Sequence, residues 1–239
     1  MRLLPPLPRA EATPERLDGL VAVEARAESL RDVARLNALF GGRRLTVRHV
    51  ARLAGRLPPG RPLIVLDVGA GCGDIPVAVV RWARRARRPI HVLALDHDGD
   101  TLGIARRRLA GYPEIVLVRG DARALPVRPG GVDLVISALT LHHLEPDAAA
   151  VALAEMAAAA GAGLVVNDLE RSRAGLLLVW LVTRLFARSP LSRHDGPLSV
   201  RRAYTAAEVR ALCDAAGLVD AAVRRYPWHR RLCLVRRSG

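Results

Sequence analysis

Three glycines and two acids stand together where a buried strand is expected to end. The stretch VLDVGAGCGDIPVAVV, residues 65–80, is apolar up to Asp67, has glycine at every second position of 69–73, and then becomes apolar again with helical spacing. Glycine lets a backbone approach a ligand where a Cβ atom would collide. The turn is therefore predicted to bind a ligand, with Asp74 capping the following helix. A tight turn with nothing bound is the structural alternative.

Histidines form the second group that could do chemistry. His142 and His143 follow an expected strand, and His194 precedes Asp195 in a segment expected to be a loop. A neutral imidazole can remove the proton of a phenol or an enol near neutral pH, and an adjacent carboxylate can orient it. We predict His143 and His194 as candidate general bases. Helix capping or packing is the alternative for His142 and His143, and a solvated loop is the alternative for His194.

Strands and helices alternate along the chain from residue 62 onward. Apolar runs with the length of buried strands are followed by segments of helical periodicity. This order predicts right-handed crossovers and an α/β fold with a mostly parallel sheet. The expected strands are residues 62–69, 90–96, 114–121, 132–139 and 162–169, and the expected helices between them are 74–88, 100–111 and 146–161.

Ligands of such sheets bind at the carboxyl ends of the strands, where the glycine turn is expected to lie. The spacing GAGCG misses the GxGxxG pattern of dinucleotide sites, because Asp74 stands at the third-glycine position. It closely resembles the first motif of the class I S-adenosylmethionine-dependent methyltransferases, an acid followed by GxGxG. HVLALDHD, GDARALP and SALTLHHLEP extend the resemblance over about residues 62–170, and the last of these is similar to ubiquinone and menaquinone methyltransferases.

The resemblance implies a Rossmann-like class I methyltransferase fold, with a mostly parallel seven-stranded sheet and helices on both faces. It implies S-adenosylmethionine as cofactor and no metal. Asp96 stands where the family places a carboxylate, which can accept both ribose hydroxyl protons. Asp121 stands where the family binds the adenine of the cofactor. A role as a helix N-cap is the alternative for either acid alone. The cofactor-binding residues implied in this way are Asp67, Gly69, Ala70, Gly71, Asp96, His97, Asp121, Ala122 and Ser137.

Segments outside the expected sheet should determine the acceptor. Residues 1–60 are predicted to form a helical cap over the cofactor, and residues 61–239 the methyltransferase domain, with a helical insertion at about 170–202. The apolar run LLLVWLVTRLF in this insertion predicts either a helix packed on the core or an apolar surface for a lipid-like acceptor or a membrane. The residues predicted to bind the acceptor are Asn37, His142, Asn167 and Arg171, the last two after the fifth strand.

The predicted function is methylation of a small aromatic, quinone-like or polyketide acceptor, with O-methylation favoured over C-methylation. RLNALFGG, NDLERS and RHDGPLSVRRAYT resemble bacterial methyltransferases linked to polyketide or quinone pathways.

A methyltransferase of nucleic acid, RNA in particular, is one alternative, because the net charge is +14. All 37 basic residues are arginine, however, which a GC-rich genome would produce by codon bias. The [DNS]PP[YFW] motif is absent after the fourth strand, so no specific nucleic acid is expected. A non-catalytic module that binds S-adenosylmethionine is the other alternative.

Cysteine usage and hydropathy bear on location. Cys72, Cys213 and Cys233 form no CxxC pair, which indicates free thiols in a reducing cytoplasm. The proline-rich start has no apolar core of a signal peptide, and no apolar run reaches the roughly 18 residues of a membrane span. The sequence predicts a cytoplasmic protein, with peripheral membrane contact through residues 172–188 left open.

Overall fold

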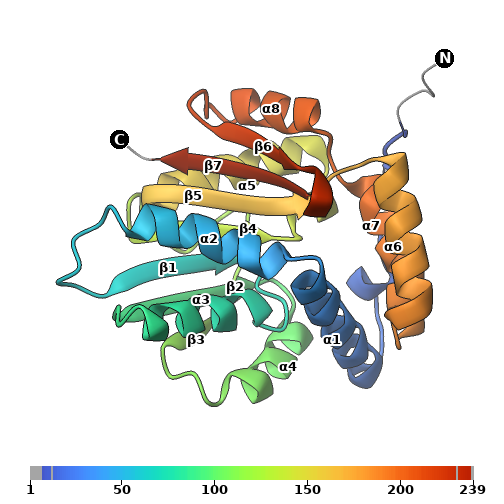
Figure 1. Cartoon of the computed structure of the whole chain (residues 1–239), viewed down its shortest axis with the longest axis horizontal. Helices are drawn as coiled ribbons and strands as arrows, with labels where there is room; N and C mark the ends of the chain where they lie inside the picture. The colour runs from blue at the N-terminus through green and yellow to red at the C-terminus, as the bar shows by residue number, and fades with distance from the viewer. Residues whose placement is uncertain (1–6, 12, 230, 238–239) are drawn as a thin grey trace.

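The computed structural model describes residues 7–11, 13–229 and 231–237. Seven strands form one sheet in the order β3-β2-β1-β4-β5-β7-β6 (Figure 1). Strands β1 to β5 pair in parallel, and β7 pairs antiparallel with both β5 and β6. The predicted Rossmann-like α/β fold is confirmed. The strands are β1 Leu63–Val68, β2 Ile90–Asp96, β3 Ile115–Arg119, β4 Val132–Ala138, β5 Ala160–Leu169, β6 Ala222–Tyr226 and β7 Arg231–Arg237.

The helices lie before, between and after these strands. In the part of the chain that the structure describes, none of them has the length and apolar character needed to cross a membrane. The α-helices are α1 Val23–Leu39, α2 Gly42–Ala54, α3 Asp74–Arg85, α4 Gly99–Leu109, α5 Pro146–Ala159, α6 Arg173–Phe186, α7 Pro190–Arg202 and α8 Ala206–Ala215, and the short 3-10 helices are η1 Arg16–Asp18, η2 Leu141–His143 and η3 Pro227–His229.

Two apolar layers enclose the sheet. Alternate residues of β1 point to opposite faces, so Val65 packs toward α2 and α3 while Leu66 packs toward α5 and α8. Val50 of α2 and Val79 of α3 are fully buried on the first face, and Leu153 of α5 is fully buried on the second. Burial on both faces explains why the central strands read as nearly continuous apolar runs.

The strand order reverses between β1 and β4. From β1 the chain runs outward to β3, and it then returns to pair β4 with the other side of β1. Crevices at such a reversal lie outside the carboxyl ends of the strands. The glycine turn at residues 69–73 and the 3-10 helix η2 both follow strands at this point, so the fold brings the two chemically capable groups of the sequence to one edge.

The first two helices have different positions. Helix α1 ends at Leu39, before Gly41–Gly42, and packs near α4 and α7. Helix α2 instead lies on the sheet, with Leu45 and Leu53 in the core layer of α3. The division into a cap at 1–60 and a domain at 61–239 stays a prediction.

The insertion at about 170–202 is the helix pair α6 and α7. They cross closely at Gly196, where an added Cβ would lie 2.7 Å from Cγ2 of Thr183. The expectation that His194 lies in a loop is wrong, because residues 190–202 form α7. Gly196 and Pro197 are turn signals in the sequence, but packing against α6 holds this segment helical.

Candidate functional site

The glycines of the turn serve two different purposes. Gly69, Gly71 and Gly73 have φ angles of 74°, 54° and 77°, which side-chain-bearing residues seldom adopt. A Cβ on Gly69 would lie 2.2 Å from Oγ1 of Thr140, so this glycine is required by packing. A Cβ on Gly71 would meet nothing closer than Cδ2 of Leu30 at 3.9 Å. Gly71 therefore leaves open space beside its backbone, which a ligand can use.

Asp67 is a buried carboxylate without a partner. It is 1% exposed, and neither carboxylate oxygen has a hydrogen-bond partner among the described residues. Burial, together with the nearby Asp74 and Asp96 carboxylates, raises the pKa of Asp67 well above its usual range. A buried charge of this kind is stable only when it is paired. The position is therefore suited to a positively charged ligand group.

Asp96 connects the second strand to the glycine turn. Its Oδ2 accepts a hydrogen bond from the Gly71 N–H at 2.9 Å, and its Oδ1 accepts one from the Asp98 N–H at 3.1 Å. Each oxygen retains a lone pair for a hydroxyl donor. Asp98, not Asp96, caps helix α4, by accepting from the backbone of Asp100 and Thr101. The helix-cap alternative for Asp96 is therefore wrong, and the carboxylate remains available to a ligand.

The other residues predicted to bind the cofactor vary in exposure. Asp121 is paired with Arg123, whose guanidinium lowers the pKa of the carboxyl to about 2, and no helix follows that it could cap. The side chain of His97 is 79% exposed and 3.5 Å from Asp96. Ala122 is half-buried and Ala70 is buried. Ser137 is buried and donates to the Val68 carbonyl, a bond between β4 and β1. Their roles toward a cofactor stay predictions.

Helix α1 is tied to the glycine turn by a buried polar chain. Asn37 donates to Oδ2 of Asp74 at 3.0 Å and accepts from Nη2 of Arg231 at 2.9 Å. The prediction that Asp74 caps α3 is wrong, because Gly73 is the N-cap and no side chain caps it. Asp74 is instead occupied by Asn37. Asn37 thus lies beside the turn, in a position that holds α1 against it, and acceptor binding by Asn37 stays a prediction.

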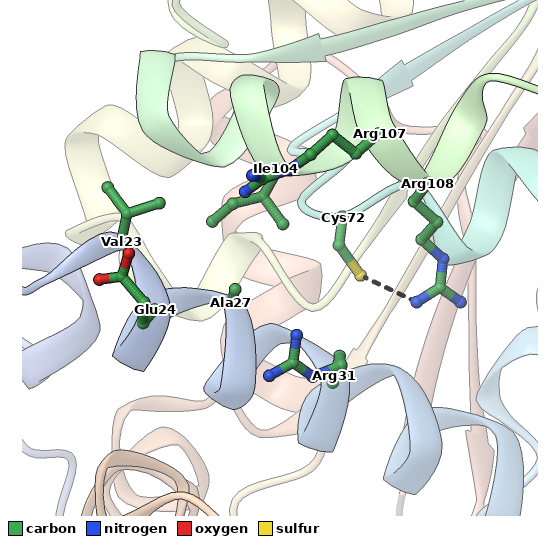
Figure 2. Close-up of a pocket in the computed structure, with 8 residues that line it drawn as sticks. All are labelled: Val23, Glu24, Ala27, Arg31, Cys72, Ile104, Arg107 and Arg108. Carbon is green, nitrogen blue, oxygen red and sulfur yellow. Dashed lines mark hydrogen bonds between the residues drawn. The ribbon is translucent and has the colours of Figure 1, made fainter.

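A cavity of about 550 Å³ lies between α1 and α4, on the outer side of the turn (Figure 2). Arg108 reaches from α4 to Sγ of Cys72 at 3.8 Å, and Arg31 lines the cavity from α1. Burial raises the pKa of the Cys72 thiol to about 11, so it is not a nucleophile near neutral pH. All three cysteines are free, as predicted. The carboxylates of Asp67 and Asp96 do not line this cavity.

His142 is a buried cation between two carboxylates. Its Nδ1 lies 2.7 Å from Oδ1 of Asp168, and its Nε2 lies 3.6 Å from Oε1 of Glu15. Burial by itself lowers the pKa of His142, but the two carboxylates raise it to about 10. His142 is therefore protonated near neutral pH. This charge state, and 3% exposure, make it a donor rather than a base.

The 3-10 helix η1 contacts one candidate base, His143, and is joined to the other, His194, through Asp195. His143 is half-buried, and its Nδ1 lies 3.2 Å from Oδ2 of Asp18. His194 is 42% exposed at its side chain, with Nδ1 2.7 Å from Oδ1 of Asp195. Asp195 in turn accepts from the backbone N–H groups of Arg16 and Leu17. Residues 16–18 thus join the segment after β4 to α7, which places both histidines around one short piece of chain.

Glu15 and Asp18 are the site residues that sequence reasoning missed. They lie in the stretch PERLDG, which has no apolar periodicity and precedes the expected helix. Nothing in their spacing pairs them with histidines more than 120 positions later. The ligand atoms of Glu15, His142 and His143 lie within 4.8 Å of one another, a spacing that could hold a metal ion. Protonation of His142 opposes metal binding there, because a metal ligand must be the neutral imidazole.

Two residues predicted to bind the acceptor have side chains that are hydrogen-bonded to other parts of the protein. Asn167 lies inside β5, not after it, and its amide donates to the Gly42 carbonyl and to Thr46 of α2. The expected strand 162–169 contains Asn167, and the structure agrees with that strand, so the expectation that Asn167 follows it is wrong. Arg171 follows β5, but it donates to the Leu7 and Ala203 carbonyls. Both side chains join segments of the protein, and acceptor binding by either stays a prediction.

Comparison with known proteins places the glycine turn in a recognised domain. Residues 65–163 match the family described as "Methyltransferase domain". The malonyl-[acyl-carrier protein] O-methyltransferase of Xylella fastidiosa is 39% identical over 85 residues, 35% of this chain and 27% of that protein. The 2-phytyl-1,4-naphtoquinone methyltransferase of Thermosynechococcus vestitus is 40% identical over 73 residues, 30% of each chain. The resemblance predicted from the sequence is confirmed.

These sequence matches cover less than a third of the curated relatives' length. Methyltransferases named for a protein release factor and for ribosomal RNA match this chain over a similar length, so such matches do not distinguish acceptors. Over most of the chain, the structure of magnesium protoporphyrin IX methyltransferase from Synechocystis PCC 6803 with bound S-adenosylmethionine is similar. It has a TM-score of 0.55 and 16% identity, and the match covers 94% of this chain and 88% of that one. At that identity the likeness shows the fold.

Proposed function

We propose that this chain transfers a methyl group from S-adenosylmethionine to a small acceptor. The observation that carries the proposal is the buried Asp67 carboxylate beside the glycine turn, which has no hydrogen-bond partner among residues 7–11, 13–229 and 231–237. Asp74 and Asp96 concentrate further negative charge at this point of a chain whose net charge is +14. A cofactor with an ammonium and a sulfonium group supplies the missing positive charge. The methyltransferase-domain match of residues 65–163 supports the same assignment.

The residues at the carboxyl ends of β1, β2 and β3 fit this cofactor. Asp67 would hold its cationic end, Asp96 its ribose hydroxyls, and Asp121 with the Ala122 amide its adenine, while Gly71 leaves room for close approach. When bound, S-adenosylmethionine supplies a methyl group that its sulfonium already makes electrophilic. The chain has two remaining tasks, to hold the acceptor in line with the methyl group and to remove its proton.

We propose a small aromatic, quinone-like or polyketide acceptor and methylation on oxygen. A phenol has a pKa near the value of about 10 for tyrosine, so a neutral imidazole is suited to receive its proton as the methyl group arrives. His143 and His194 are the histidines that the structure leaves partly exposed around residues 16–18.

Transfer of a labelled methyl group tests the proposal. With labelled S-adenosylmethionine, we expect label in a phenolic small-molecule extract and none in total RNA. Asp96→Ala should weaken cofactor binding by about 1.5–3 kcal/mol, the value of a hydrogen bond to a charged group. Asp100→Ala, which removes an exposed acid from the first turn of α4, is the matched control and should leave calorimetric affinity unchanged.

Three results would contradict the proposal. Equal cofactor affinity in the Asp96→Ala variant and the parent protein would remove the assignment of the ribose site. Label in RNA alone would assign the basic surface to a nucleic-acid substrate. Cofactor binding without transfer to either extract would favour the non-catalytic module.

Replacement of the true base should lower turnover and leave cofactor binding intact. General base catalysis contributes about 10²- to 10⁴-fold, so His143→Ala or His194→Ala should slow the reaction by that factor near neutral pH. His91→Ala, at an exposed histidine of β2, is the control. The rate of each variant is measured across pH on an accepted phenol. Near-normal rates in both variants would show that positioning alone drives transfer.

A further inference from the structure

We propose that the outer face of helix α6 binds the surface of an anionic lipid bilayer. This face consists of Leu177, Trp180, Leu181 and Leu185, together with Arg173 and Arg184. Leu177 is 65% exposed and Leu185 is 64% exposed, although both are leucines of a regular helix. Exposed apolar residues that gather on one face mark an interaction site, whereas scattered ones do not. The proposal does not depend on methyl transfer.

The sequence spacing places these side chains together. Residues 177, 181 and 185 recur every four positions, and residue 180 is adjacent to them on the helix surface. The opposite side of α6 is buried against α7, where Val182 and Thr183 lie close to Gly196. In Figure 1, α6 lies at the edge of the molecule, with α7 between it and α1. The outer face is therefore directed away from the protein.

The positive charge around this face indicates that the surface it binds is anionic. Residues 172–203, all of which the structure describes, contain six arginines and one acid. The acid is Asp195, which is 4% exposed and accepts from the backbone of η1, so it does not offset the surface charge. Five arginines of this segment are exposed, two of them on the outer face of α6 and the others after α6 or on α7: Arg173, Arg184, Arg188, Arg193 and Arg201. An apolar helix face flanked by arginine is typical of helices that lie in the headgroup region of a membrane.

Trp180 and Arg184 support a lipid surface more than a protein groove. The Arg184 guanidinium lies 5.4 Å from the centre of the Trp180 ring. Tryptophan is enriched at the level of lipid headgroups, where its ring is buried and its N–H remains hydrated. Self-association of the protein through this face is disfavoured, because a symmetric contact would bring the arginines of the two copies together. The face is the outer surface of one helix, which suits a deformable bilayer.

Fluorescence of a single tryptophan tests the proposal directly. The chain has three tryptophans, Trp82, Trp180 and Trp228. In a Trp82→Phe/Trp228→Phe protein, vesicles of phosphatidylcholine and phosphatidylglycerol should shift the Trp180 emission to the blue, and brominated acyl chains should quench it. In a Trp82→Phe/Trp180→Phe protein, Trp228, which is 94% exposed, should show neither change. No cofactor or acceptor is added, so the result is independent of the enzymatic assay.

Sedimentation with vesicles separates the apolar and electrostatic contributions. Leu177→Ser/Leu181→Ser and Arg184→Gln/Arg188→Gln should each lower partitioning onto anionic vesicles by about tenfold or more. Val116→Ser/Val151→Ser, at exposed apolar positions of β3 and α5, should leave it unchanged. Circular dichroism checks that each variant is folded.

Three outcomes would overturn the proposal. Failure of the parent protein to bind anionic vesicles would exclude a bilayer, in favour of an acidic protein partner. Equal binding to neutral phosphatidylcholine vesicles would remove the electrostatic basis of the assignment. A solution dimer that Leu177→Ser/Leu181→Ser dissociates, without vesicle binding by the parent, would assign the face to self-association.

Discussion

Replacing Gly71 by valine should lower the affinity for S-adenosylmethionine by at least about 100-fold, which corresponds to about 2.7 kcal/mol. A Cβ at this position meets no protein atom closer than 3.9 Å, which is ordinary van der Waals contact, so the first atom of the added side chain has room in the folded protein. It would take up the space beside the turn that the cofactor requires. Calorimetric titration measures the affinity, and thermal unfolding shows whether the fold is kept.

Gly217→Val is the matched control for the backbone. Gly217 has a φ of 70°, close to the 54° of Gly71, and its Cβ would meet nothing within 4 Å, whereas that of Gly71 would meet only Cδ2 of Leu30 at 3.9 Å. Valine at either position therefore carries a similar conformational strain, of about 1–3 kcal/mol. Only Gly71→Val should lose affinity for S-adenosylmethionine. Similar affinity in the two variants would contradict the assignment of the glycine turn to the cofactor.

Replacing His142 by glutamine should destabilise the protein by about 3–5 kcal/mol, because it leaves the Asp168 and Glu15 carboxylates buried without their cation. Denaturation by urea measures the loss in the free energy of unfolding. His143→Gln is the control, since His143 is partly exposed and its ion pair with Asp18 is worth less than about 1 kcal/mol. Adding Asp168→Asn to His142→Gln should restore part of the stability, because one unpaired charge is removed.

The contribution of His142 should depend on pH in a defined direction. Its pKa is raised to about 10 in the folded protein, above the ordinary value of 6.5. The stabilisation is therefore fully present below about pH 6.5 and is lost as pH rises through about 10. The difference in the free energy of unfolding between the parent and His142→Gln should shrink over that interval. Taking the difference cancels the titration of groups that the two proteins share. A difference that stays constant up to pH 10 would show that His142 is neutral in the fold.

The sequence alone determined strands β1 to β5 and their carboxyl ends, whereas β6 and β7 had no counterpart among the expected strands. Buried strands and amphipathic helices differ in apolar period, and right-handed crossovers leave few ways to join them. The turn at Gly69–Gly73 could be recognised because a ligand that approaches the backbone restricts residue type locally. Asp96 could be placed for the same reason, since the end of a strand is defined within its own segment.

Only the tertiary structure decided the surroundings of the histidines. Glu15 and Asp18 meet His142 and His143 because η1 packs against α7, and no local pattern encodes a contact between residues so distant in the chain. Asp74 looked like a helix cap until Asn37 of α1 was found to occupy it. His194 looked like part of a loop, but the fit of Gly196 against Thr183 holds its segment helical. Propensity and periodicity act within one element, whereas these positions depend on which elements pack together.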